Sequence, residues 1–212
     1  MSRPLVVFGG KSTALEIAEV VRRFMVDEYS QVLLAVPDDE DADGSSRLHL
    51  PELRARVARS TEPAGYIISM WDQGVRREWL QLAEDLQLVP GSVVHPSAYV
   101  SDTATIGRGV YLAANSVVSA GATIADHVIV NYSVTVGHDS VVGSHSFLNP
   151  GARLSGHVTV GQRVLIGSNA FVFQGVSIGH DCLIDAMTYI DRNIEPRMIC
   201  SSKQLQVHKR VF

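Results

Sequence analysis

The chain has 212 residues, of which 46% are hydrophobic and 19% are charged, a composition that excludes a disordered chain and suits one or two folded domains. Eighteen basic and 22 acidic side chains give a formal net charge of −4, which provides no basic field for nucleic acid. No apolar run is long enough to span a membrane, and the first residues lead directly into a strand-like run, so we expect a cytoplasmic protein.

Residues 1–93 alternate apolar runs with amphipathic segments. Three runs have the length and composition of strands: residues 5–8, 31–36 and 66–70. Three segments have the apolar spacing of helices: residues 12–25, 50–58 and 75–86. Because strands that alternate with helices form parallel sheets, we expect a small Rossmann-like α/β domain over residues 1–93.

The end of the first predicted strand is a candidate site for a nucleotide-linked sugar. Two glycines and a lysine stand there, directly before a helix whose N-terminal amide groups can receive a phosphate. Two aspartates follow the second strand, where an acid can bind a ribose or a uracil-type group. The candidate substrate-binding residues in this domain are Gly9, Gly10, Lys11, Asp38, Asp39 and Arg76. A tight turn without a binding function is the alternative interpretation of the two glycines.

From Val94 to Ile190 every sixth residue is aliphatic, without a break in the register. The residue four positions after each of them is small or β-branched, from Ala98 to Ile194. Hexapeptide repeats of this kind are typical of a parallel β-helix. We expect such a helix over residues 94–195, with three repeats in each triangular coil and residues 18 positions apart stacked in neighbouring coils. We also expect residues 196–212 to form a cap, because a solenoid has open ends.

Two finer expectations concern small residues in this region. Glycine often follows the aliphatic position, and we expect it to allow the turn at the corner of the coil. Cys182 and Cys200 are too few for a disulfide scaffold or a metal cluster, and we expect both to be inert small side chains.

His138 and Asp139 are the candidate catalytic pair. A histidine can remove the proton of an acceptor, and a neighbouring carboxylate can orient its ring. The stacking of residues 18 apart places His157 beside Asp139 and Gly156 beside His138, so that the glycine leaves space for a reactant. Two polar residues at a solvated corner are the alternative interpretation.

A second stack contains His127, His145, Arg163 and Asp181, each 18 positions from the next. Two imidazoles in neighbouring coils favour a zinc site, but the guanidinium group that follows disfavours a cation. We therefore expect no metal cofactor. Asn131 and Asn149 also stack, either as a structural amide ladder or as part of an acceptor pocket.

Several motifs together carry a resemblance to a known family. They are Val94-His95-Pro96-Ser97-Ala98, Asn131, Val136-Gly137-His138-Asp139, Val142-Gly143, Pro150-Gly151, Leu154-Ser155-Gly156 and Val160-Gly161. With these motifs the chain resembles, over nearly its whole length, the hexapeptide-repeat sugar acetyltransferases of the sialic acid O-acetyltransferase and bacillosamine-pathway N-acetyltransferase family. The resemblance implies a left-handed β-helix, a homotrimer, acetyl-CoA as the acyl donor, and His138 as a general base oriented by Asp139.

The resemblance also assigns binding residues, and the chain departs from the family at three places. The implied coenzyme-binding residues are Phe147, Gly156, Ser168 and Ala186, and Asn131 joins the substrate-binding candidates. The family's Gly-x-x-Gly-His turn reads Gly9-Gly10-Lys11-Ser12-Thr13 here, and Phe147 stands where a second histidine is usual. The family's terminal Gly-x-Pro-Ala segment is replaced by Cys200-Ser201-Ser202.

The predicted function is acetyl-CoA-dependent N-acetylation of a nucleotide-linked amino-deoxy sugar. One alternative is O-acetylation of a sugar such as sialic acid. A second is a metal-dependent hydratase of the β-helical carbonic anhydrase type, and a third is a noncatalytic scaffold.

Overall fold

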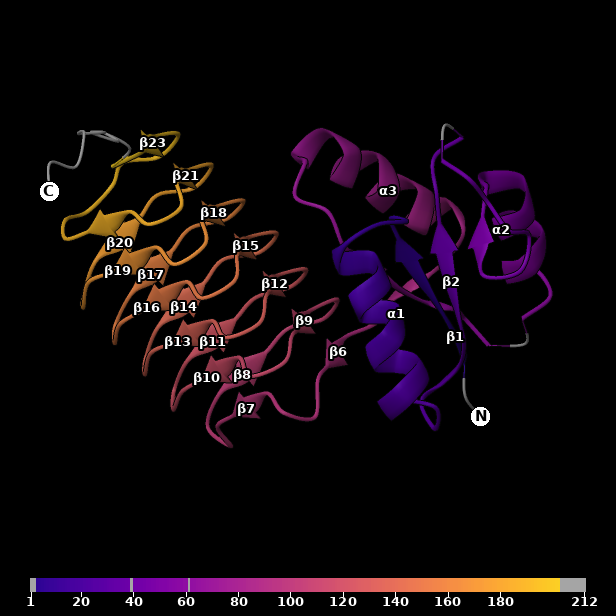
Figure 1. Ribbon diagram of the computed structural model, residues 1–212, viewed down its shortest axis with the longest axis horizontal. Coiled ribbons are helices and arrows are strands. Elements are labelled where there is room, and N and C mark those ends of the chain that lie inside the picture. The colour runs from indigo at the N-terminus through magenta and orange to yellow at the C-terminus, as the bar shows by residue number, and fades with distance from the viewer. Residues whose placement is uncertain (1–2, 39, 61, 203–212) are drawn as a thin grey trace, which may run out of the picture.

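The computed structural model describes residues 3–38, 40–60 and 62–202, which form an α/β domain followed by a long triangular prism of short strands (Figure 1). None of the helices among these residues is long and apolar enough to cross a membrane.

The α/β domain is built on a parallel sheet with the strand order β3-β2-β1-β4-β5. Its strands are β1 (Arg3–Phe8), β2 (Tyr29–Ala35), β3 (Arg47–Leu48), β4 (Gly65–Ile68) and β5 (Val89–Pro90). Its helices are α1 (Thr13–Phe24), α2 (Leu50–Val57) and α3 (Gln73–Asp85). The three predicted strands and three predicted helices are confirmed. The sequence analysis missed β3 and β5, because strands of two residues are too short to show a hydrophobic pattern.

Helices cover both faces of this sheet, and successive side chains of β1 point to opposite faces. Leu5 and Val7 pack with buried residues of α1, whereas Val6 and Phe8 pack with residues of α2 and α3. The strand order reverses between β1 and β4, so the carboxyl ends of these strands border the position where open α/β sheets bind ligands.

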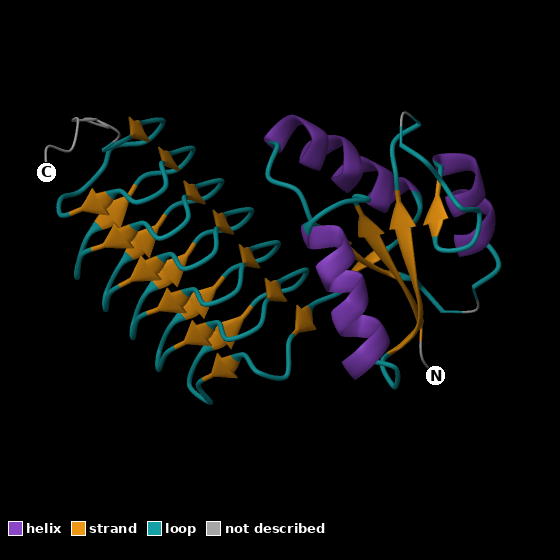
Figure 2. Ribbon diagram, in the orientation of Figure 1, coloured by secondary structure: helices purple, strands orange, loops and turns teal. Residues whose placement is uncertain are grey.

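The prism has three flat faces, each a parallel sheet of two-residue strands (Figure 2). Face 1 contains β6 (Val93–Val94), β9 (Tyr111–Leu112), β12 (Ile129–Val130), β15 (Phe147–Leu148), β18 (Leu165–Ile166), β21 (Leu183–Ile184) and β23 (Ile199–Cys200). Face 2 contains β7 (Tyr99–Val100), β10 (Val117–Val118), β13 (Thr135–Val136), β16 (Arg153–Leu154), β19 (Phe171–Val172) and β22 (Tyr189–Ile190). Face 3 contains β8 (Thr105–Ile106), β11 (Thr123–Ile124), β14 (Val141–Val142), β17 (Thr159–Val160) and β20 (Ser177–Ile178).

The predicted stacking is confirmed by the register of these sheets. Val117 pairs with Thr135 and Ile129 pairs with Phe147, in each case a separation of 18 residues. The aliphatic residue of each repeat is the second residue of its strand and fills the core from Leu112 to Ile190. Val94 is 37% exposed because the first coil has no coil below it. Strands continue past the expected limit at residue 195 as β23, and residues 203–212 of the expected cap lie outside the described residues.

The expected role of the glycines that follow the aliphatic positions is wrong. These glycines do not have positive φ; instead, the residue three positions after each aliphatic residue from Ile106 to Ile184 adopts the left-handed conformation, as Asp139 does with φ 56° and His157 with φ 58°. A Cβ atom on Gly137 or Gly143 would lie 2.5–2.7 Å from backbone atoms of the next coil. Glycine is therefore required at these positions for the close approach of neighbouring coils.

We expect Gly143→Ala to lower the free energy of unfolding by about 1–3 kcal/mol, because the new methyl group overlaps backbone of the next coil that cannot move aside. Urea unfolding followed by circular dichroism measures this change. Gly74→Ala is the matched control, since its added Cβ would meet only the side chain of Asp72, at 3.2 Å. Equal stability of the two variants would contradict the interpretation.

Face 1 joins the prism to the α/β domain. Tyr111, Ile129 and Phe147 of face 1 belong to the same buried cluster as Ile17 and Val21 of α1. Figure 1 shows the face 1 strands nearest the α/β domain, with faces 2 and 3 on the far side of the prism. The corner between faces 2 and 3 therefore lies opposite the α/β domain of the same chain.

Candidate active site

His138 and Asp139 lie at the corner between β13 of face 2 and β14 of face 3. The Nδ1 atom of His138 lies 2.8 Å from Oδ2 of Asp139. The left-handed backbone conformation of Asp139 turns its carboxylate toward the ring of the preceding residue. Both side chains are about half exposed in the single chain, at 54% and 55%. The hydrogen bond to His138 holds the pKa of Asp139 below its usual value, so the carboxylate stays ionised.

The next coil adds His157 and Gly156 to this corner, as the stacking predicts. The rings of His138 and His157 meet edge to face with centroids 4.8 Å apart, and Nε2 of His157 lies 3.9 Å from Oδ2 of Asp139. A Cβ atom on Gly156 would overlap the His138 ring, closest to Nε2. The missing side chain therefore leaves the space that the His138 ring occupies.

The same three side chains are the group in the described part of the chain that most resembles a metal site. One ligand atom each from His138, Asp139 and His157 lie within 4.8 Å of one another. Two imidazoles and a carboxylate are a suitable donor set for zinc. Within the described part of the chain, this corner is therefore the candidate site for a metal-dependent alternative.

The second predicted stack is of a different kind. The rings of His127 and His145 lie parallel with centroids 5.1 Å apart, which is a stacking contact. Arg163 and Asp181 form two hydrogen bonds of 2.6 and 3.0 Å. The stack thus consists of a ring pair and an ion pair.

We expect protonation of His127 to lower the free energy of unfolding in acid. Burial lowers its pKa to about 4, and the positive charges of His145 and Arg76 add to the effect. A histidine in the unfolded chain titrates near 6.5, so stabilisation is complete above that pH and declines by up to about 3 kcal/mol as the pH falls toward 4.

Urea unfolding at pH 7 and pH 4.5 measures this loss, and His127→Asn should remove most of it. Asparagine tolerates the left-handed conformation of residue 127, where φ is 60°. An unchanged loss of stability in the variant would contradict the assignment.

A cavity at the carboxyl ends of β1 and β4 contains the predicted glycine loop. Its lining residues are Gly9, Gly10, Lys11, Ser12, Thr13, Pro37, Glu40, Ser69, Met70, Val75 and Trp79. Ser12, which stands where the family has its second glycine, keeps a positive φ of 45°. Trp79 has a buried indole N–H without a hydrogen-bond partner among the described residues. We call this space the acceptor cavity.

The acidic side chain at this cavity is Glu40, which the sequence analysis missed. Its carboxylate lies 3.1 Å from Nζ of Lys11 and 3.4 Å from the guanidinium group of Arg47. Asp38 is exposed and does not line the cavity, and Asp39 lies outside the described residues. Glu40 comes directly after the two predicted acids in the sequence, and only the path of the loop distinguishes it from them.

Arg76 does not face the acceptor cavity, which corrects the expectation for this residue. Its side chain is 1% exposed and donates hydrogen bonds to the carbonyl groups of Ile68, Met70 and His127. The guanidinium group thus joins α3 to the prism. Val75 and Trp79 occupy the side of α3 that borders the acceptor cavity.

The structure does not bring the implied coenzyme residues together within one chain. Phe147, which stands where the family has a second histidine, is buried in the hydrophobic cluster that face 1 shares with α1. Ser168 and Ala186 lie at the corner between faces 1 and 2, whereas Gly156 lies at the corner with His138. Asn131 is buried and donates from Nδ2 to the backbone carbonyl of Leu148, a hydrogen bond within the prism.

Comparison with known proteins connects this geometry to enzymes. Residues 157–192 match a family model described as the hexapeptide repeat of succinyl-transferase. No curated protein matches the sequence. The acetyltransferase domain of PglB from Neisseria gonorrhoeae, also solved with acetyl coenzyme A, is 27% identical, with a TM-score of 0.81 over 93% of this chain and 96% of that chain.

Two further solved structures agree. A mutant of perosamine N-acetyltransferase from Caulobacter crescentus, in complex with CoA and GDP-perosamine, is 26% identical, with a TM-score of 0.80 over 92% of each chain. WeeI from Acinetobacter baumannii is 17% identical, with a TM-score of 0.83 over 93% of this chain and 96% of that chain, and supports the fold. The predicted fold, an α/β domain followed by a left-handed β-helix, is confirmed. The resemblance to hexapeptide-repeat sugar acetyltransferases and the enzyme class, an acyltransferase, are confirmed as well.

Proposed function

We propose that this chain transfers the acetyl group of acetyl-CoA to the amino group of a nucleotide-linked amino-deoxy sugar, with His138 as the general base. The contact of 2.8 Å between His138 and Asp139 is the observation that carries the proposal. When the Nδ1–H group of His138 donates a hydrogen bond to the carboxylate of Asp139, Nε2 carries a lone pair that can accept a proton.

The reaction follows from these groups. The sugar amine attacks the thioester carbonyl, Nε2 of His138 takes the amine proton, and the coenzyme leaves as the thiolate. Asp139 stabilises the imidazolium ion that forms. Acetyl-CoA is the proposed donor because the PglB domain was solved with acetyl coenzyme A and the perosamine enzyme with CoA.

The residues of the acceptor cavity support the proposal that the chain binds a nucleotide-linked sugar as its second substrate. Gly9 and Gly10 line the cavity just before the start of α1, where the helix dipole favours a phosphate. Lys11 and the unpartnered indole N–H of Trp79 add donors on the same wall. A nucleotide-linked amino sugar is the proposed acceptor, and GDP-perosamine in the Caulobacter crescentus complex belongs to that class.

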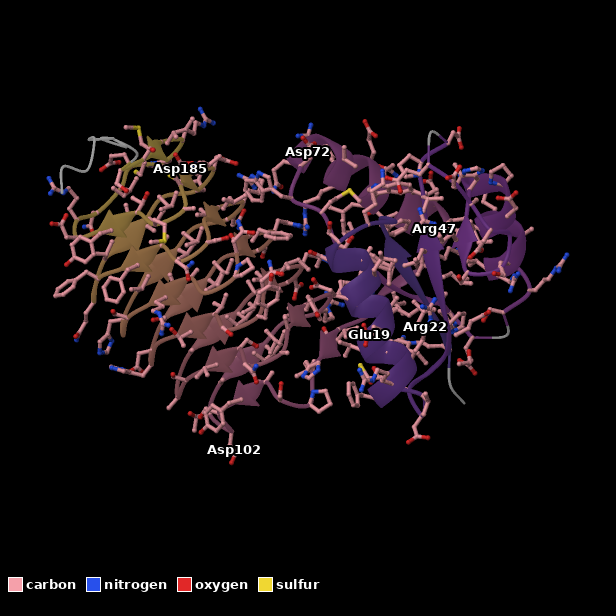
Figure 3. All side chains as sticks on the ribbon, in the orientation of Figure 1. Glu19, Arg22, Arg47, Asp72, Asp102 and Asp185 are labelled. Carbon is pink, nitrogen blue, oxygen red and sulfur yellow. The ribbon has the colours of Figure 1, made fainter. Side chains whose placement is uncertain are left out.

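A homotrimer is part of the proposal. The acceptor cavity and His138 belong to opposite sides of the prism, so one chain cannot bring its own acceptor to its own base. Asp102 lies at the same corner as His138, two coils earlier, and Figure 3 shows it far from the labelled Arg47 of the α/β domain. Arg47 in turn donates a hydrogen bond to the carbonyl group of Gly10, which lines the acceptor cavity. Face 2 and its end expose Tyr99, Phe173 and Tyr189, and burying such side chains between copies is favourable at about 25 cal/mol per Å² of apolar area.

The test is a thiol-release assay with acetyl-CoA across a panel of nucleotide-linked amino sugars and sialic acid, together with metal analysis. We expect thiol release with an amino-sugar nucleotide. Release with sialic acid alone would establish O-acetylation instead. Stoichiometric bound zinc without thiol release would favour a hydratase at His138, Asp139 and His157 and would contradict the proposal.

A further inference from the structure

A second cavity lies between α3 and the corner where face 3 meets face 1. Its lining residues are Gln73, Arg76, Arg77, Leu80, His145 and Arg163, and we call it the α3 cavity. Its volume is about 160 Å³. Helical spacing separates it from the acceptor cavity, because Val75 and Trp79 face one side of α3 and the residues of the α3 cavity face another.

Positive charge dominates this cavity. Of its three arginines, Arg163 is paired with Asp181, whereas Arg77 is exposed and has no carboxylate partner among the described residues. Arg76 is buried against three carbonyl groups, and its Nε has no partner among the described residues. Burial lowers the pKa of Arg76 to about 10, which still leaves the group charged at neutral pH. A buried cation without a counter-ion is costly, so an anion in this cavity would be stabilised.

The pKa of His145 reflects the positive charge around the α3 cavity. Its pKa lies below the usual value because of burial and then because of the positive charges of Arg76 and Arg163. Asp126 is the acidic group that opposes this effect. The ring of His127 stacks on the other side of His145 and has a lowered pKa itself. Cations therefore outweigh acids around this imidazole.

We propose that the α3 cavity binds a phosphate dianion, either as free phosphate or as the phosphate group of a small metabolite. Arg77 approaches the ligand from α3, with the charge of Arg76 behind it. Arg163, whose guanidinium group is held by Asp181 and Gln162, borders the cavity from the prism. The amide of Gln73 already donates to the carbonyl groups of Trp71 and His145, and the dipole of α3 has the matching sign for an anion. The ligand thus connects the α/β domain to the β-helix at a site separate from the proposed reaction.

Isothermal titration calorimetry of the full chain with inorganic phosphate tests the proposal. We expect one phosphate site per chain in the α3 cavity, besides any phosphate held in the acceptor cavity. The affinity of this site should fall about tenfold in Arg77→Gln and in Arg163→Gln, since each removes a positive charge beside the ligand. Arg54→Gln, which changes an exposed arginine of α2, should bind as the wild type does. Lys11→Glu distinguishes the two cavities and should leave binding in the α3 cavity unchanged. A parallel titration with a sugar phosphomonoester distinguishes a metabolite from free phosphate by its relative affinity.

A second readout is the protonation of His145, followed by NMR. Phosphate should raise the pKa of His145 in the wild type, because an anion offsets the neighbouring guanidinium groups, and should do so much less in Arg77→Gln. Absence of phosphate binding by the wild type at millimolar concentration would overturn the proposal. Binding that is lost in Lys11→Glu and kept in Arg77→Gln would assign the phosphate to the acceptor cavity and would overturn it as well.

Discussion

Replacing His138 with alanine is expected to lower the turnover of acetyl transfer by about 10²–10⁴-fold, the usual contribution of a general base. The affinity for acetyl-CoA should change little, because the imidazole acts on the proton of the acceptor. Steady-state kinetics of thiol release, with coenzyme binding measured separately, distinguishes these effects. In a pH–rate profile, the limb that reports deprotonation of the base should disappear in the variant.

Variants of the neighbouring side chains define how His138 is supported. Asp139→Asn should cost less than His138→Ala, since the imidazole remains and only its orientation is disturbed. If His157 supports Asp139 from the next coil, Asp139→Asn combined with His157→Ala should cost more than the two single changes together. His145→Ala is the matched histidine control at a different corner. Near-normal turnover of His138→Ala in an assembly that binds acetyl-CoA would refute the mechanism.

Mixing two inactive variants is expected to restore activity. His138→Ala keeps the acceptor cavity, and Lys11→Glu keeps the base. When the two chains are unfolded together and refolded, roughly a quarter of the interfaces in randomly assorted trimers should join an intact cavity to an intact base. The physical reason is that the α/β domain packs on face 1, opposite the corner that holds His138.

Controls for this experiment are the same variants refolded separately, which should stay inactive. Mixing His138→Ala with His138→Asn is the matched negative control, because both chains lack the base and no intact site can form. Light scattering should show the same assembly size in every sample. A stable monomer, or activity that does not return on mixing, would contradict a site shared between chains.

The β-helix is the part of the protein that the sequence determines almost completely. Its aliphatic residues recur every six positions, and each strand pairs with the strand 18 residues away. Every contact that matters is repeated and close in sequence, so the pattern specifies the core, the stacking, and the meeting of His138 with His157. The predicted pair of His138 and Asp139 could be found for the same reason.

Atomic detail of the corners was not determined in this way. From Ile106 to Ile184 the left-handed residue is the third after each aliphatic position, and it is often Asn, Asp or His, residues that tolerate this conformation. That recurrence could have been detected in the sequence. The need for glycine at residues 137 and 143 depends on the distance to the next coil, which only the packed structure defines.

Tertiary structure alone decided the contacts between the two domains. Arg76 and Phe147 were both predicted to bind ligands, yet one donates hydrogen bonds to carbonyl groups beneath α3 and the other is buried in the cluster that face 1 shares with α1. Glu40 reaches the acceptor cavity although Asp38, two residues earlier, does not. The placements of Arg76 and Phe147 depend on the non-repeating interface between the α/β domain and the prism, and that of Glu40 depends on its ion pairs with Lys11 and Arg47. A repeat specifies neighbours that are regularly spaced along the chain, whereas such an interface arises only when the whole chain has packed.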